Sequence, residues 1–147
     1  MNDALLGLRH RTYAMFVDLG RAPTAGEVAD ASGLTLEEVG EGWRELHQHH
    51  ALVLDDSGSA IRMANPFSAV ETPYRVFADG RWWFANCAWD AFGICAALDV
   101  EGEIRTACPD CGERIEVSVR EKQPSDRDLL FHCLVPASRW WDDIVFT

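Results

Sequence analysis

The two residues best suited to chemistry are Cys87 and Asp90, which lie three positions apart after an aromatic-rich stretch. Asn86 is a good N-cap, so the sequence predicts a helix with Cys87 at its first position. Residues three apart share a helix face, so the thiol and the carboxyl should point the same way. The positive end of a helix lowers a thiol pKa and favours the thiolate, which binds metals and attacks electrophiles. Asp90 would then be a nearby acid or base.

The same pair also has a purely structural interpretation. Free cysteine is among the most buried residue types, so Cys87 could be a small core residue. Asp90 would then only stabilise the first helical turn. If the pair is reactive, a charged Asp90 opposes ionisation of Cys87, and the two groups should titrate together.

A second candidate site is the sequence Cys-Pro-Asp-Cys-Gly, which contains Cys108 and Cys111. A turn of this kind can bring two thiolates onto one tetrahedral zinc ion. The ligands that could complete such a site are His132 and Cys133 in a predicted strand over residues 129–135. Neighbours in a strand point to opposite faces, so only one of them would ligate without distortion. The alternative is a reversible disulfide between Cys108 and Cys111.

Three histidines, His47, His49 and His50, cluster at the end of a predicted helix. They could capture a metal ion. The simpler interpretation is that cationic side chains suit a helix C-terminus, and we prefer it.

The elements that position Cys87 are a hairpin and a helix. Asp79-Gly80 is a strong two-residue turn between apolar runs. The helix that follows carries Ile94 and Leu98 on the stripe of Cys87, and Cys95 lies off that stripe as a buried residue. Residues 104–107 and 114–120 are predicted strands, and the second alternates apolar and polar side chains. A terminal strand is predicted after residue 139.

The first half of the chain is predicted to form three helices and a small hairpin. Helical spacing covers residues 4–19, and capping boxes at Thr24–Glu27 and Thr35–Glu38 begin two more helices. Residues 51–54 and 60–63 then read as two short strands. This order is typical of a winged helix-turn-helix. The predicted fold class is α+β: a three-helix winged-helix-like lobe (residues 1–66) packs on a small mixed or antiparallel sheet lobe (residues 67–147) with a short helix carrying Cys-x-x-Asp.

The charge of the first lobe argues against DNA binding. Residues 1–66 contain five Arg, no Lys and ten acidic residues, a balance of −5. The predicted third helix carries four glutamates against one arginine, and phosphate contacts need Lys and Arg. We therefore expect this lobe to serve as a packing domain.

Composition sets the remaining bounds. The chain has 147 residues, 48% of them hydrophobic, and a net charge of −11, which disfavours nucleic acids and membrane surfaces as partners. No apolar run has the length of a membrane span and no signal peptide opens the chain, so a cytoplasmic location is expected. Five cysteines in that compartment are expected to be thiols or ligands rather than a disulfide framework.

The segments NCAWDAFGICAAL, TACPDCGERIEVSV and RWWDDIVFT resemble the core of the organomercurial (alkylmercury) lyase family. The resemblance covers roughly residues 74–147 and marks residues 67–147 as an alkylmercury-lyase-like core. It implies that Cys87 binds mercury and that Asp90 handles protons, while Cys108 is mainly structural. It also implies a small organometallic or thiol-reactive substrate and no required cofactor. The family's second catalytic Cys precedes the last strand, where this sequence has Trp140 to Asp143 and no Cys.

Three functions follow as hypotheses. The first is an organomercurial-binding protein that cleaves the carbon–mercury bond by protonolysis through Cys87 and Asp90. Without the family's second Cys, its turnover is expected to be weak or absent. The second is a non-enzymatic metal- or thiol-binding sensor or carrier that uses Cys87 with Cys108 and Cys111. The third is a winged-helix regulator, which the charge disfavours.

Overall fold

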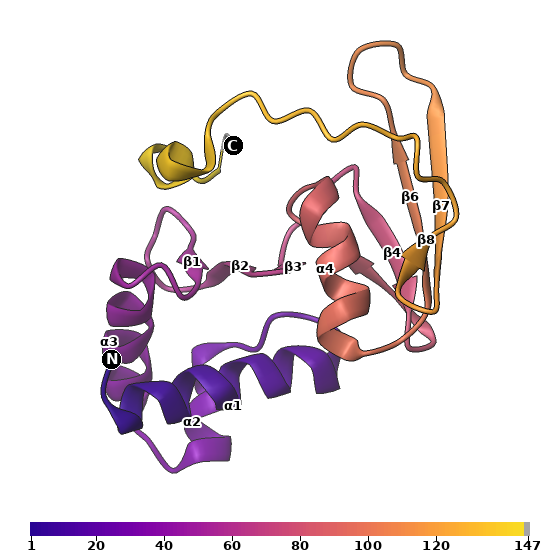
Figure 1. Cartoon of the computed structure of the whole chain (residues 1–147). Helices are drawn as coiled ribbons and strands as arrows, with labels where there is room; N and C mark the ends of the chain where they lie inside the picture. Colours follow the sequence, from indigo (N-terminus) through magenta and orange to yellow (C-terminus); the bar gives the residue numbers. More distant parts are fainter. Residues whose placement is uncertain (146–147) are drawn as a thin grey trace.

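The computed structural model describes residues 1–145, which form four α-helices, eight short strands and one 3₁₀ helix (Figure 1). The elements in chain order are α1 (Asp3–Leu19), α2 (Ala25–Ser32), α3 (Leu36–Gln48), β1 (Val53–Leu54), β2 (Ile61–Ala64), β3 (Phe67–Ser68), β4 (Arg75–Ala78), β5 (Arg81–Phe84), α4 (Ala88–Leu98), β6 (Gly102–Ala107), β7 (Arg114–Arg120), β8 (Gln123–Pro124) and η1 (Ala137–Asp142). The α+β class predicted from the sequence is confirmed. None of the helices within residues 1–145 has the length and apolarity needed to cross a membrane.

The first three helices begin where their caps predict. Thr24 and Glu27 form a reciprocal capping box at the start of α2, and Thr35 and Glu38 form another at α3. Each box satisfies backbone N–H groups that a helix start leaves unpaired. Arg21 also pairs with Glu27 at 2.6 Å. The helix order is therefore set by local sequence.

The core of the first lobe lies between α1 and α3. Val39, Trp43 and Leu46 on α3 are fully buried, as predicted. The Trp43 indole N–H donates to Thr12 Oγ1 at 3.0 Å, which satisfies a buried donor. His50 is exposed and lies beyond the end of α3 with a φ of 59°.

A three-stranded antiparallel sheet in the order β1-β2-β3 follows the helices. The predicted hairpin is present as β1 and β2, and β3 adds an edge within the predicted linker. The winged-helix assignment itself stays a prediction. The absence of DNA binding also stays a prediction. The exposure of all four glutamates of α3 agrees with it, because they would repel phosphate groups.

The second sheet is antiparallel, with strand order β5-β4-β6-β7-β8. Asp79 (φ 51°) and Gly80 (φ 73°) make the predicted two-residue turn between β4 and β5. A two-residue hairpin turn of type I′ requires a positive φ at both central residues. Helix α4 covers β4 and β6 on one face of the sheet (Figure 1). A Cβ at Gly102 would lie 2.7 Å from Cys95 Sγ, so a glycine is needed for this close packing.

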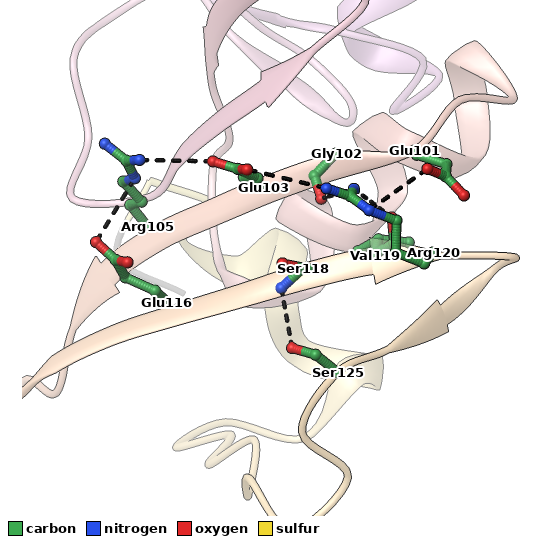
Figure 2. Close-up of polar contacts among 9 residues, drawn as sticks. All are labelled: Glu101, Gly102, Glu103, Arg105, Glu116, Ser118, Val119, Arg120 and Ser125. Atoms are coloured by element: carbon green, nitrogen blue, oxygen red, sulfur yellow. Dashed lines mark hydrogen bonds and ion pairs between the residues drawn. The ribbon is translucent and has the colours of Figure 1, made fainter.

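The opposite face of β6 and β7 is polar. Arg105 lies 3.5 Å from Glu103 and 3.6 Å from Glu116, and Arg120 lies 3.4 Å from Glu101 (Figure 2). These pairs are solvent-exposed, so each contributes little to stability. They confirm the predicted alternation, because Val117 and Val119 on the other face are buried. The apolar face is thus turned toward α4.

One hydrophobic core runs through both halves of the chain. The ring of Phe67 lies 5.4 Å from that of Phe16 and 5.0 Å from that of Trp83. Arg81 donates to the carbonyl oxygens of Val17 and Asp18 at the end of α1, at 3.3 Å each. The division into residues 1–66 and 67–147 stays a prediction, and this packing crosses its boundary.

The C-terminal segment differs from the sequence-based expectation. The predicted strand over residues 129–135 is irregular, and a 3₁₀ helix, η1, occupies part of the predicted terminal strand. Residues 146 and 147 of that strand lie outside the described residues. Residues 129–145 pair with neither sheet, and β8 pairs only with the last two residues of β7. Leu130 is 95% exposed as a result.

Candidate functional site

Cys87 is the N-cap of α4 and not its first helical residue, which corrects the sequence-based prediction. Its backbone is extended (φ −152°, ψ −178°), and its sulfur accepts a hydrogen bond from the backbone N–H of Asp90 at 3.5 Å. The helix therefore starts one residue later than predicted, with the Cys87 sulfur in the capping position where Asn86 was expected. The thiol and the carboxyl nevertheless lie in the same first turn.

The environment of Cys87 raises the pKa of its thiol instead of lowering it. Burial is the main cause, and the negative charges of Asp90 and of a Cys133 thiolate add to it. The backbone N–H groups of Asp90 and Trp89 act in the opposite direction and are outweighed. The helix N-terminus is therefore not sufficient to make this thiol acidic, because desolvation penalises the charged form more strongly.

Asp90 is half-buried, and burial raises the pKa of its carboxyl. The side-chain amide of Asn86 donates to Asp90 Oδ2 at 2.9 Å and partly opposes the shift. The charge of Asp90 also raises the pKa of Tyr13 on α1, although burial of that phenol is the larger cause. Asp90 is thus a carboxyl that retains its proton to a higher pH than usual.

Asn86 is a site residue that the sequence did not reveal in this role. Its Nδ2 lies 3.0 Å from Asn65 Oδ1 and 3.4 Å from the carbonyl oxygen of Pro66, in addition to its bond with Asp90. It therefore links the start of α4 to the end of the first sheet. Its Oδ1 is buried and has no hydrogen-bond partner among the described residues. No local signal could have shown this, because the contacts span about twenty residues of chain.

A largely apolar cavity of about 450 Å³ opens beside Cys87. Tyr74 and Ala88 line it, and Ala88 directly follows Cys87. The pKa of Tyr74 is raised by burial and by the charge of Cys87, which places the phenol close to the thiol. The walls come from α4, from β6 and β7, and from the C-terminal segment: Phe92, Ile104, Thr106, Ile115, Val117, Gln123, Pro124, Asp126, Arg127, Leu129, Leu130 and Phe131.

The C-terminal segment passes over the start of α4 and brings Cys133 toward the site. The ring of Phe131 lies 6.4 Å from that of Trp89, and Trp141 stacks on His50 with centroids 3.9 Å apart. Cys133 is exposed, and its thiol donates to the carbonyl oxygen of Val135 at 3.1 Å. Among the described thiols, Cys133 is the one whose charge acts on Cys87. Asp142, in contrast, is exposed and paired with Arg139 at 2.9 Å, so it is surface charge.

The Cys108–Cys111 turn is closed by two backbone hydrogen bonds. The Gly112 N–H donates to the Cys108 carbonyl at 2.9 Å, and the Cys108 N–H donates to Glu113 at 2.8 Å. The N–H groups of Cys111 and Asp110, followed by the Cys111 thiol, lower the pKa of Cys108. Residues 1–145 contain no group of three or more His, Cys, Asp or Glu side chains placed to hold a metal. A zinc ion at this turn would therefore find two protein ligands there.

The three histidine side chains make separate contacts and do not meet at one point. His47 Nδ1 accepts a hydrogen bond from the Leu54 N–H at 3.2 Å, whereas His49 lies 3.9 Å from Glu45. His50 instead stacks on Trp141. The preferred interpretation, a polar helix end, agrees with these separate contacts. Cys95 is buried, as predicted.

Comparison with known proteins gives a family and a fold. The family model for alkylmercury lyase (MerB) matches residues 67–147. The crystal structure of the mercury-bound form of MerB2 is similar, with a TM-score of 0.67 and 25% sequence identity. The alignment covers 86% of this chain and 60% of that chain, so this chain spans less than two thirds of that protein. No curated protein matches this chain.

Proposed function

The chain belongs to the alkylmercury lyase family, and we propose that it binds an organomercurial through Cys87 and cleaves the carbon–mercury bond with a proton from Asp90. The observation that carries this proposal is the shared first turn of α4, where the backbone N–H of Asp90 donates to the Cys87 sulfur and burial raises the pKa of the Asp90 carboxyl. The site residues and the mechanism are part of the proposal.

Binding begins at the sulfur of Cys87. Thiolates are soft ligands and mercury is a soft metal, so the sulfur displaces a weaker ligand from the organomercury cation. The thiol proton leaves with that ligand. A raised thiol pKa does not prevent the exchange, because formation of the sulfur–mercury bond drives the deprotonation.

The proton for cleavage comes from Asp90. Its carboxyl, whose pKa is raised by burial, would donate a proton to the carbon bound to mercury. The electron pair of the carbon–mercury bond becomes the new carbon–hydrogen bond, and the hydrocarbon leaves. Mercury stays on Cys87 with one coordination position open, and Asp90 is left as a carboxylate. Asn86 would position the carboxyl through its 2.9 Å hydrogen bond.

Cys133 is our candidate for the second thiol. The family's second catalytic Cys has no counterpart at residues 140–143. Cys133 is supported instead by its electrostatic effect on Cys87 and by the contact of Phe131 with Trp89. Its thiol would bind mercury at the position that the hydrocarbon vacates, and the thiol proton would pass to solvent as the sulfur–mercury bond forms. The hydrocarbon group itself suits the apolar cavity beside Cys87.

To test the proposal, the protein is mixed with a phenylmercuric ion and an excess of a small monothiol. Two quantities are measured: the mercury that stays bound to the protein and the benzene that is released. The wild type should retain the ion and release benzene. Cys87→Ser should lose both, and Cys95→Ser, a matched removal of a buried thiol outside the site, should keep both. If Cys87→Ser retains and cleaves as well as the parent, the assignment of the site fails.

A non-enzymatic soft-metal carrier is the second candidate. It is favoured by the free thiols of Cys108 and Cys111 together with the lowered pKa of Cys108. Such a protein would retain mercury without releasing any hydrocarbon, so the benzene measurement separates the two functions.

A further inference from the structure

We propose that Cys108 and Cys111 form a second soft-metal site, separate from Cys87, that chelates the mercuric ion between two thiolates. The site lies in the turn that joins β6 to β7. It concerns the bare ion and not the organomercurial, because the ion offers two strong coordination positions and the organomercury cation offers one. The proposed role, to hold the product ion, rests on the proposed function.

The turn geometry fixes both cysteines. The hydrogen bonds from Gly112 to Cys108 and from Cys108 to Glu113 hold the chain in a closed loop. Gly112 adopts a φ of 74°, which a residue with a side chain rarely accepts. The two cysteines occupy opposite ends of this short loop. A preformed pair loses less conformational freedom on chelation than two thiols on flexible chain.

The chemistry of the pair selects soft ions that need few ligands. Both thiols are free, Cys111 is exposed and Cys108 is half-buried, so an ion can reach them from solvent. Zinc takes four ligands, and residues 1–145 place no third donor at the turn. Soft thiolates favour thiophilic ions such as the mercuric ion.

The sheet places this turn at the same end as Cys87. Arg75 in β4 pairs with Phe84 on one side and with Arg105 on the other. The chain reaches Cys87 three residues beyond Phe84 and Cys108 three residues beyond Arg105. In Figure 1 the β6–β7 turn and the start of α4 both lie toward the top of the sheet. The two proposed sites therefore lie toward the same end of the sheet.

The exchange balances with thiols alone. A mercuric ion carried by two small thiolates meets the thiols of Cys108 and Cys111. Two protein sulfur–mercury bonds form and two small-thiol sulfur–mercury bonds break. The two small thiolates leave with the two protons that the protein thiols release. No oxidant or reductant takes part, since mercury and sulfur keep their oxidation states.

The test uses the full chain with mercuric chloride in excess small monothiol and measures retained mercury. Cys87→Ser serves as the background, so that retention at the first site is removed. Adding Cys108→Ser or Cys111→Ser to it should weaken retention about 10²-fold, the loss expected when a tethered second ligand is removed. Adding Cys95→Ser instead is the matched control and should change nothing. Helical circular dichroism checks the fold of each variant.

Retention of the mercuric ion that survives both Cys108→Ser and Cys111→Ser would overturn the proposal, as would no retention in the Cys87→Ser background. A phenylmercuric ion gives the separate readout for the first site. Its retention should be unaffected by Cys108→Ser and lost in Cys87→Ser. If only the phenylmercuric result differs from this expectation, the proposed function is contradicted and the proposal of a Cys108–Cys111 site is not.

Discussion

The backbone N–H of Asp90 donates to Cys87 Sγ at 3.5 Å, so the thiol and the carboxyl are parts of one helical turn. Burial raises the pKa of both groups. Both are therefore protonated in the free protein at higher pH than an exposed thiol or carboxyl would be. A soft metal can displace the proton of Cys87, and Asp90 then still holds the proton that protonolysis needs.

The first prediction concerns Asn86. Asn86→Ala removes the hydrogen bond that stabilises the charged form of Asp90, so the pKa of Asp90 should rise further. Carboxyl NMR titration measures this shift. Asn65→Ala is the matched control, because it removes another partner of Asn86 and leaves the bond to Asp90. A pKa of Asp90 that falls or stays constant in Asn86→Ala would show that Asn86 does not act on the carboxyl.

The second prediction is the order of thiol reactivity. The thiolate is the nucleophile, and the pKa of Cys108 is lowered while that of Cys87 is raised. Iodoacetamide at neutral pH should therefore label Cys108 before Cys87, and buried Cys95 should react slowly. Mass spectrometry of peptides over a time course gives the rates. Faster labelling of Cys87 would mean that the helix N-terminus dominates over burial.

The third prediction tests the core of the first lobe. Thr12 Oγ1 accepts from the Trp43 indole at 3.0 Å and donates to the Leu8 carbonyl at 2.9 Å, and all of this is buried. Thr12→Val keeps the shape but leaves the indole N–H unpaired, which should cost about 1–3 kcal/mol of unfolding free energy. Thr12→Ser keeps the hydroxyl and loses one methyl, about 0.8 kcal/mol. Urea denaturation compares them, and a valine variant as stable as the serine variant would contradict the role of this bond.

Features with local causes could be predicted from the sequence. The capping boxes that begin at Thr24 and Thr35 involve residues three positions apart. The Asp79-Gly80 turn needs only two left-handed residues. The family resemblance also rested on local motifs, and the match over residues 67–147 confirmed it.

Features with distant causes could not be predicted. The side chain of Asn86 bonds Asn65, which lies in the turn between β2 and β3, far away in the sequence. The thiol pKa of Cys87 depends on burial, which spacing does not reveal. The apolar stretch over residues 129–135 resembles a strand, but it is irregular and mostly exposed, because strand formation depends on tertiary packing that local sequence does not show.

The role of Asp90 as the proton donor is tested most directly by the rate of benzene release in a single turnover of the bound phenylmercuric ion. This rate is measured across pH for the wild type and for Asp90→Asn. The acid form of Asp90 is the active one, so the wild-type rate should fall as pH rises through its raised pKa. Asp90→Asn should bind the ion equally well and release benzene about 10²–10⁴-fold more slowly, the usual loss for a general acid. Release by Asp90→Asn at the wild-type rate, with the same pH profile, would contradict the account.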